Sequence, residues 1–367
     1  MRGCRRCSGR AAVVTWMVIM MLAAVGCAQT PHKIAARLPE AYMRTKMSLI
    51  HVGSNDSFNP TSDGTRAARL LLDTLENKGL DNARKAIEIY DAIIPRENYG
   101  GEYTALQWFA QYLVSSQIEK STFLSDPFVA EFFYFFADND FSALKEYLKR
   151  KYNLENVDDR DTRTGQERRA LLEDTILFNN PRREQWERTS QILKAIKLKK
   201  GVVVADVGSG PGYFTYRFSG MVGDHGRVFA IDTVQKHLEY IDHFSRKFGM
   251  QNITTVHTDG KTIGLAGEKV DAVFLCSLYH NIYGMASLDV REQFLNSIKS
   301  ALKADGVLYL IDNGMVQPGT LPYHGPYIAK ELIVAQLNQY GFDLVEQHQP
   351  VVQRYMLVFK LREKNQR

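Results

Sequence analysis

The pattern of hydrophobic and polar positions divides this chain into a helical first half and a second half of alternating strands and helices. Between residues 61 and 178, apolar residues recur at the spacing of one helix face, and Gly79 and Pro95 separate successive segments. From residue 202 onward, short apolar runs rich in β-branched residues alternate with amphipathic segments. A strand covered by helices on both faces reads as a continuous apolar run, so this half predicts an α/β domain with a largely parallel sheet.

Seven helices are predicted ahead of the first strand. The fourth contains the aromatic block Glu131–Phe136, which could form a wall for an apolar substrate or a membrane contact. We favour the alternative, in which this block is the buried central helix of a small helical domain. The seven helices are expected over residues 66–77, 82–94, 103–118, 128–137, 141–152, 167–178 and 182–196.

The second half opens on a strand that ends at Asp206 and leads through a glycine-rich turn into a helix over Tyr213–Val222. Strand, glycine-rich turn and helix are the start of a nucleotide-binding βαβ unit. A helix over about 327–340 is predicted near the end of the chain. The strands are expected over residues 202–207, 227–232, 253–260, 270–276, 302–312 (after a helix end and a glycine turn), 342–347 and 354–361.

The spacing of the glycines separates two kinds of nucleotide site. A dinucleotide fingerprint has glycine at its first, third and sixth positions, and the sixth position here is Tyr213. The chain instead reads Asp-x-Gly-x-Gly-x-Gly from Asp206 to Gly212, and Asp232 ends the next strand twenty positions later. This arrangement resembles the first motifs of the class I S-adenosylmethionine (SAM) dependent methyltransferases.

The resemblance covers residues 180–361 and implies a Rossmann-like, seven-stranded sheet with an antiparallel last strand. It also implies SAM as the cofactor, bound across the carboxyl ends of the strands. Asp232 would then accept the ribose hydroxyls, Asp259 the adenine amine, and Asp206 would order the glycine loop. The expected cofactor-binding residues are Asp206, Gly208, Ser209, Gly210, Gly212, Asp232, Asp259, Gly260 and Cys276, the last at the end of its strand.

Methyl transfer needs an oriented acceptor, and it needs a general base only when that acceptor must lose a proton. Tyr279 and His280 follow the fourth strand, where this fold places residues that face the transferable methyl group. His280 can act as the base, since its ordinary pKa lies near neutrality, or it can be a histidine that stabilises the loop. Weaker candidates at the same edge are Tyr283, Asp312, Asn313 and His324. The acceptor is expected to be a small molecule, and no cluster has metal-ligand spacing.

The first 26 residues carry four arginines and then an apolar run over residues 11–25. With small residues before Cys27, this segment resembles a bacterial lipoprotein signal, in which Cys27 would be lipidated; an uncleaved anchor is the alternative. Removing the four arginines lowers the formal net charge from +5 to +1, so we expect no nucleic-acid partner. No oligomeric state is indicated.

The expected organisation is a signal (1–26), a tether (27–60), a helical domain (61–155), a linker with a lead-in helix (156–180) and a methyltransferase domain (181–363). The lipoprotein signal predicts a membrane-anchored protein whose domains lie outside the cytoplasm, whereas SAM is made inside. A start at Met43 or Met47 would give a cytoplasmic enzyme instead. A third alternative is an anchored, non-catalytic binding protein that retains the methyltransferase fold.

Overall fold

A computed structural model of the protein describes residues 52–54, 60–284, 287–314 and 326–363. All of them belong to one compact unit, Thr45–Arg367. Within these ranges, no helix has both the length and the apolar character needed to span a bilayer. The predicted signal, Cys27, Met43, Met47 and His324 lie outside the described residues.

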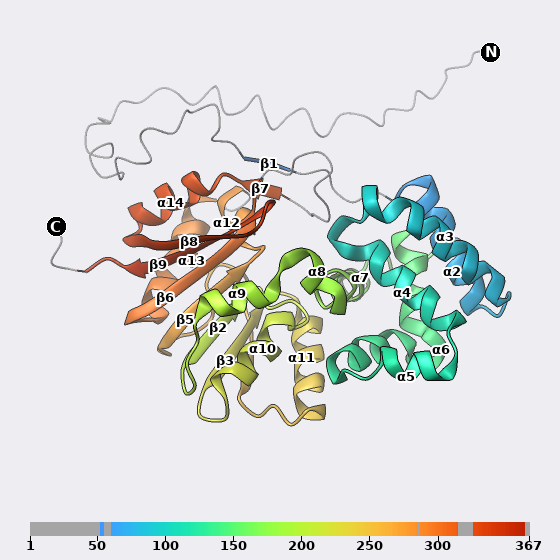
Figure 1. Ribbon diagram of the computed structural model, residues 1–367. Coiled ribbons are helices and arrows are strands. Elements are labelled where there is room, and N and C mark those ends of the chain that lie inside the picture. The colour runs from blue at the N-terminus through green and yellow to red at the C-terminus, as the bar shows by residue number, and fades with distance from the viewer. Residues whose placement is uncertain (1–51, 55–59, 285–286, 315–325, 364–367) are drawn as a thin grey trace, which may run out of the picture. The chain divides into compact units, whose positions relative to one another are not determined.

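Polar side chains cap the N-termini of four of the six described helices in the first half. The Thr61 hydroxyl accepts the N–H of Gly64 at 3.1 Å, and the Asp126 carboxylate accepts the N–H of Phe128 at 2.8 Å. The helices are α2 (Ser62–Leu75), α3 (Leu80–Glu97), α4 (Glu102–Val114), α5 (Gln117–Phe123), α6 (Pro127–Lys151) and α7 (Arg163–Phe178), drawn from blue to light green in Figure 1.

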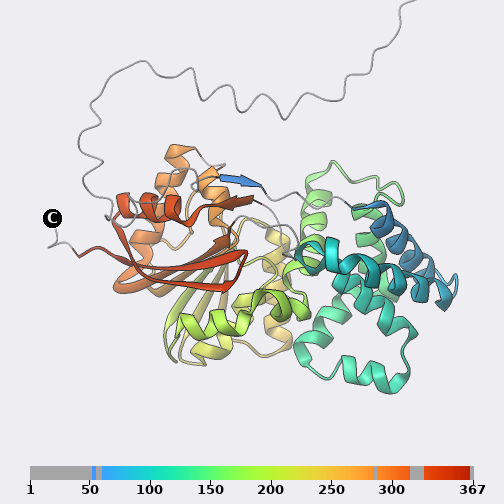
Figure 2. The same ribbon diagram turned by 45° about the horizontal axis from the view of Figure 1, so that its top comes forward.

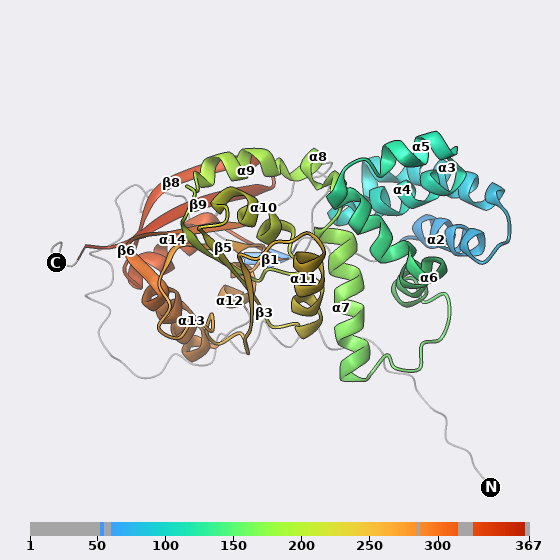
Figure 3. The same ribbon diagram turned by 90° about the horizontal axis from the view of Figure 1, so that it is seen from below.

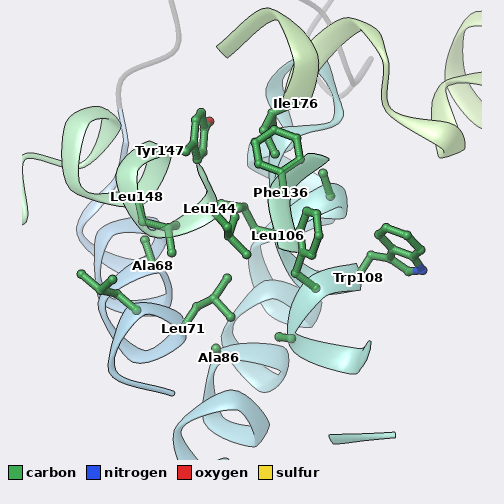
Figure 4. Packing of buried hydrophobic residues seen from close by; sticks show 14 of the residues in the cluster. Ala68, Leu71, Ala86, Leu106, Trp108, Phe136, Leu144, Tyr147, Leu148 and Ile176 are labelled. Carbon is green, nitrogen blue, oxygen red and sulfur yellow. The ribbon is translucent and has the colours of Figure 1, made fainter. Parts of the chain in front are cut away.

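Large apolar side chains from these helices meet in one core (Figure 4). Leu71 of α2, Leu106 of α4, Phe136 and Leu144 of α6 and Ile176 of α7 are all fully buried. Burial of each such side chain is worth roughly 1.5–3 kcal/mol, so this core contributes strongly to the packing of the helices.

The aromatic block Glu131–Phe136 lies in α6, and its position confirms the core interpretation. Phe132 and Phe133 are buried among the other helices. Phe135 faces the second half of the chain instead, and its ring packs edge-on against Tyr240, with 5.0 Å between centroids. The block therefore serves the helical core and also its contact with the α/β half.

Two predicted helices are broken, and local chemistry explains the first break. The predicted helix 103–118 is wrong at its end, because Ser116 and Glu119 form a reciprocal capping box that starts α5. The predicted helix 182–196 is interrupted at Arg188, whose φ of 56° is left-handed. In its place stand the 3-10 turn η4 (Pro181–Arg183) and the helices α8 (Glu184–Glu187) and α9 (Thr189–Ile196).

The second half folds into a seven-stranded sheet, as the sequence predicts. The strand order is β4-β3-β2-β5-β6-β9-β8, with β9 antiparallel to both of its neighbours and every other pair parallel. The strands are β2 (Val203–Val207), β3 (Arg227–Asp232), β4 (Ile253–His257), β5 (Val270–Cys276), β6 (Leu302–Asn313), β8 (Phe342–Val351) and β9 (Arg354–Leu361). Figure 2 shows the red β8–β9 hairpin that forms one edge of the sheet.

Helices cover both faces of this sheet (Figure 3). On one face lie α9, α10 (Tyr213–Val222) and α11 (Gln235–Lys247). On the other lie α12 (Tyr279–Gly284), α13 (Leu288–Ala301) and α14 (Lys330–Gln339). Strand order reverses between β2 and β5, so the loops after these strands diverge and leave a crevice at their carboxyl ends.

A short strand pair was missed by the sequence pattern. Strand β1 (Val52–Ser54) pairs antiparallel with β7 (Pro326–Ile328). The predicted helix over 327–340 is therefore wrong at its start, since residues 327 and 328 are extended and α14 begins only at Lys330. Three-residue strands carry too little periodicity to be separated from the helix that follows.

Candidate functional site

The carboxyl ends of the central strands surround a cavity of about 460 Å³. The loop after β2, the end of β3, the segments after β4 and β5, and α7 from the helical half all contribute to its lining. This volume lies within the range of small-molecule and cofactor sites, and its position is the switch point at which doubly wound sheets bind ligands.

The glycine loop after β2 leaves space and an unsatisfied hydroxyl at the cavity. Gly208 and Gly210 have φ angles of 73° and 53°, in the left-handed region that glycine adopts without strain. Apart from its two chain neighbours, no residue in the described ranges has an atom within 4 Å of the place that a Cβ on Gly210 would take. The hydroxyl of Ser209 is buried and has no hydrogen-bond partner among the described residues. An open backbone beside an unsatisfied hydroxyl fits a polar ligand group held against this loop.

Gly212 is required for a different reason. It is outside the cavity lining, and a Cβ there would come within 2.5 Å of the Tyr216 ring. Its φ of 96° opens helix α10, so this glycine serves packing and chain direction rather than contact with a ligand.

Asp206 lines the cavity but is mainly engaged with the protein. Its carboxylate accepts the Thr215 hydroxyl at 2.6 Å, which ties the end of β2 to the first turn of α10. Burial raises the pKa of Asp206 to about 7. The sequence expectation that Asp206 orders the loop agrees with this position.

Asp232, at the end of β3, fixes the glycine loop and stays ionised. Its carboxylate accepts the N–H of Gly210 and the N–H of Val234, each at 2.8 Å. Burial raises the pKa of Asp232, but His237 and these two N–H groups outweigh burial and hold the pKa below its ordinary value. An ionised carboxylate in the cavity wall suits the hydroxyl groups of a ribose.

Asp259 is not brought into the cavity, although its neighbours Thr258 and Gly260 line it. The Asp259 side chain is 63% exposed and accepts the N–H of Lys261 at 3.0 Å. This carboxylate closes a surface turn, so the structure offers no support for the expected contact with an adenine amine.

His280 and Asp312 form a buried pair at the other end of the cavity. Nδ1 of His280 lies 2.6 Å from one oxygen of Asp312, and the backbone N–H of His280 donates to the other at 2.9 Å. A carboxylate oxygen accepts from a ring N–H, so this contact orients the imidazole with Nδ1 toward Asp312 and Nε2 away from it. His280 lines the cavity, whereas Tyr279 does not: its hydroxyl donates to Gln336.

An ionic cluster that the sequence did not reveal lies behind the end of β5. Arg183 and Arg354 both pair with Glu187, and all three side chains are at least 94% buried. Arg354 also donates to Ser277 at 2.7 Å and lies 3.3 Å from the sulfur of Cys276. Burial raises the pKa of the Cys276 thiol to about 11, so it stays protonated at neutral pH and fills the cavity wall as a neutral group.

The sheet order, the acid at the end of β3 and the glycine loop match the arrangement expected of a class I SAM-dependent methyltransferase domain. SAM is the cofactor of that class, and the residues present fit it. The open backbone at Gly210 and the unsatisfied hydroxyl of Ser209 match the polar methionine end of SAM. The ionised Asp232 matches its ribose. Residues 204–306 match the family model described as a methyltransferase domain.

The curated relatives of this chain are named as methyltransferases, but their names give different methyl acceptors. The chain is 34% identical over 85 residues to a probable cobalt-precorrin-6B C(15)-methyltransferase (decarboxylating) of Saccharolobus solfataricus, which covers 23% of this chain and 43% of that protein. It is 30% identical over 117 residues to the arsenite methyltransferase of Homo sapiens, 30% of each chain. The chain thus spans less than half the length of these relatives.

Among solved structures, a SAM-dependent methyltransferase from Aquifex aeolicus is 22% identical and superposes with a TM-score of 0.41. The match covers 49% of this chain and 93% of that one.

Proposed function

We propose that this protein transfers the methyl group of SAM to a small-molecule acceptor held in front of His280. The observation that carries the proposal is one continuous cavity that joins the loop at Gly210 and the ionised Asp232 to the His280–Asp312 pair. A cofactor site and a proton acceptor on opposite sides of one cavity are what a methyl transfer to a protonated nucleophile requires.

The roles of the residues follow from their contacts. Bound SAM supplies an electrophilic methyl group on a sulfonium. Asp232 and the glycine loop would hold its nucleoside and methionine parts, which leaves His280 to receive the proton that an acceptor hydroxyl, amine or thiol loses. Asp312 keeps Nδ1 protonated and stabilises the imidazolium that forms, while orientation in the cavity supplies much of the rate.

Calorimetry on residues 33–367 with SAM, S-adenosylhomocysteine and NAD tests the cofactor assignment. We expect both sulfur compounds to bind and NAD not to bind. Asp232→Ala should weaken SAM binding by about 1.5–3 kcal/mol, because charge-assisted hydrogen bonds are lost. Asp259→Ala is the matched control: it removes an acid from the end of the next strand but outside the cavity, so the affinity should stay within twofold of wild type.

We also propose that the chain is anchored to the membrane through a lipid on Cys27, with its folded part outside the cytoplasm. The arginines before residues 11–25 support this proposal, because they favour retention of the N-terminal end inside. Labelling cells with a lipid precursor should mark the wild type and not Cys27→Ser. A soluble, unlabelled protein that begins at Met43 or Met47 would refute the anchor and leave the methyltransferase assignment intact.

A further inference from the structure

A buried histidine in the cavity wall has an N–H group without an acceptor. His237 is the third residue of α11 and is 2% exposed. Its Nδ1 lies 3.3 Å from Asp232 Oδ1, and its Nε2 lies 3.2 Å from Asp174 Oδ2. The second contact is an ion pair without hydrogen-bond alignment, so Nε2 has no hydrogen-bond partner among the described residues. All three side chains line the cavity.

The two carboxylates keep His237 charged. Burial in itself lowers the pKa of His237, but Asp174 and Asp232 outweigh burial and raise the pKa to about 10. At neutral pH both ring nitrogens therefore carry protons. A buried N–H without an acceptor costs free energy, and it indicates a ligand atom that completes the site.

Asp174 comes from the helical half of the chain and provides an acceptor beside this donor. It lies on α7, its side chain is 30% exposed, and the polar partner of its carboxylate within the described ranges is His237. Burial raises the pKa of Asp174, while the charge of His237 opposes the rise. A carboxylate and an imidazolium N–H at one point of the cavity form a donor–acceptor pair, which suits a hydroxyl group because a hydroxyl both donates and accepts.

We propose that Asp174 and His237 bind the ribose hydroxyls of the cofactor together with Asp232, so that the helical half of the chain forms part of the nucleoside site. This inference rests on the proposed SAM-dependent function. The acidic residue that joins Asp232 in this site comes from α7 rather than from the loop after β4, where Asp259 faces solvent. This arrangement gives the helical half a role in cofactor affinity.

The test compares two substitutions at adjacent positions on α7. Asp174→Asn removes the acceptor charge in the cavity. Glu173→Gln removes the same charge from a residue that pairs with Arg169 and Lys151 instead of lining the cavity. Dissociation constants are measured by calorimetry for S-adenosylhomocysteine and for 5′-methylthioadenosine, which lacks the amino-acid end. We expect Asp174→Asn to weaken both ligands by about ten- to a hundredfold, and Glu173→Gln to leave both within twofold.

Analogues without the hydroxyls separate binding from a purely structural role. The 2′,3′-dideoxy form of methylthioadenosine should bind wild type more weakly than the parent compound does. The ratio of the two dissociation constants should be at least fivefold smaller in Asp174→Asn than in wild type. An unchanged affinity with a lowered melting temperature would overturn the proposal and reduce the Asp174–His237 contact to a tie between the two halves of the chain. If wild type binds neither ligand, the methyltransferase assignment itself fails, and that outcome differs from loss of affinity in one variant.

Discussion

Glu102 predicts a pH-dependent loss of stability in the helical half. This first residue of α4 is fully buried, and its Oε1 accepts the hydroxyl groups of Tyr147 and Tyr152, the latter at 2.9 Å. Its Oε2 has no hydrogen-bond partner among the described residues. Burial raises the pKa of Glu102 from 4.5 to about 7, outweighing Lys151 and the two tyrosines. Between these two pH values the folded protein therefore binds more protons than the unfolded chain.

The sign and the size of the effect follow from proton linkage. The free energy of unfolding falls as the pH rises from about 4.5 to about 7, and the whole loss, about 3 kcal/mol, is present above pH 7. Glu102→Gln keeps an oxygen acceptor for both tyrosines and does not titrate, so it lacks this contribution. Relative to wild type, the variant should gain about 3 kcal/mol of stability between pH 4.5 and pH 8.

Urea unfolding of wild type and Glu102→Gln, followed by circular dichroism from pH 4.5 to pH 8, measures the difference between their free energies of unfolding. Groups that titrate in the same way in both proteins cancel in this difference. Tyr152→Phe is the control: it removes one donor but keeps the acid, so stability should still fall with rising pH, unlike in Glu102→Gln. If the stability curves of wild type and Glu102→Gln ran parallel across this pH range, the carboxyl group would titrate alike in the folded and unfolded states. The argument from burial would then be refuted.

Two further pairs of substitutions address the site. Once an acceptor is found, His280→Gln and Asp312→Asn should each lower turnover by about a hundredfold or more, while the affinity for SAM stays within twofold of wild type. An equal loss of SAM affinity would mark the pair as structural. Gly210→Ala places a methyl group in open cavity space, so it should weaken SAM binding and cost only the strain of its left-handed φ, about 1–2 kcal/mol. Gly212→Ala carries the same kind of strain and also meets the Tyr216 ring, so it should lower the melting temperature more. Calorimetry and thermal unfolding separate the two, and the reverse ranking would contradict the assignment of the loop.

Features set by neighbouring residues could be predicted from the sequence. The limits of β3, β5 and β9 agree with the predicted ranges, since a strand that is largely buried on both faces reads as a largely apolar run. Asp232 was identified as a cavity acid because the end of a parallel strand is located by its own run of residues. The same reasoning failed for Asp259, since two residues beyond a strand are enough for a turn to direct a side chain to solvent.

Features that depend on distant segments could not be predicted. Arg188 adopts a left-handed φ inside a stretch with good helical spacing, and its sequence neighbours do not require this. The Arg183–Glu187–Arg354 cluster joins α8 to the first residue of β9, although more than 160 positions separate them. Each residue alone reads as a surface charge, because burial of a charge becomes tolerable only after its partner is placed.

The same reasoning explains why the helical half was given no role in binding. Asp174 lies one turn before the end of a helix that reads as an ordinary amphipathic segment, and His237 reads as a polar residue at the start of another. His237 lies only five positions after Asp232, whereas Asp174 reaches His237 only through the packing of α7 against α11. A strand-end acid can be found from one segment, but a donor–acceptor pair that two helices share exists only in the folded chain. On the proposal made above, the cofactor site extends beyond the segment that resembles methyltransferases, and the residues outside that segment are where its affinity can differ from theirs.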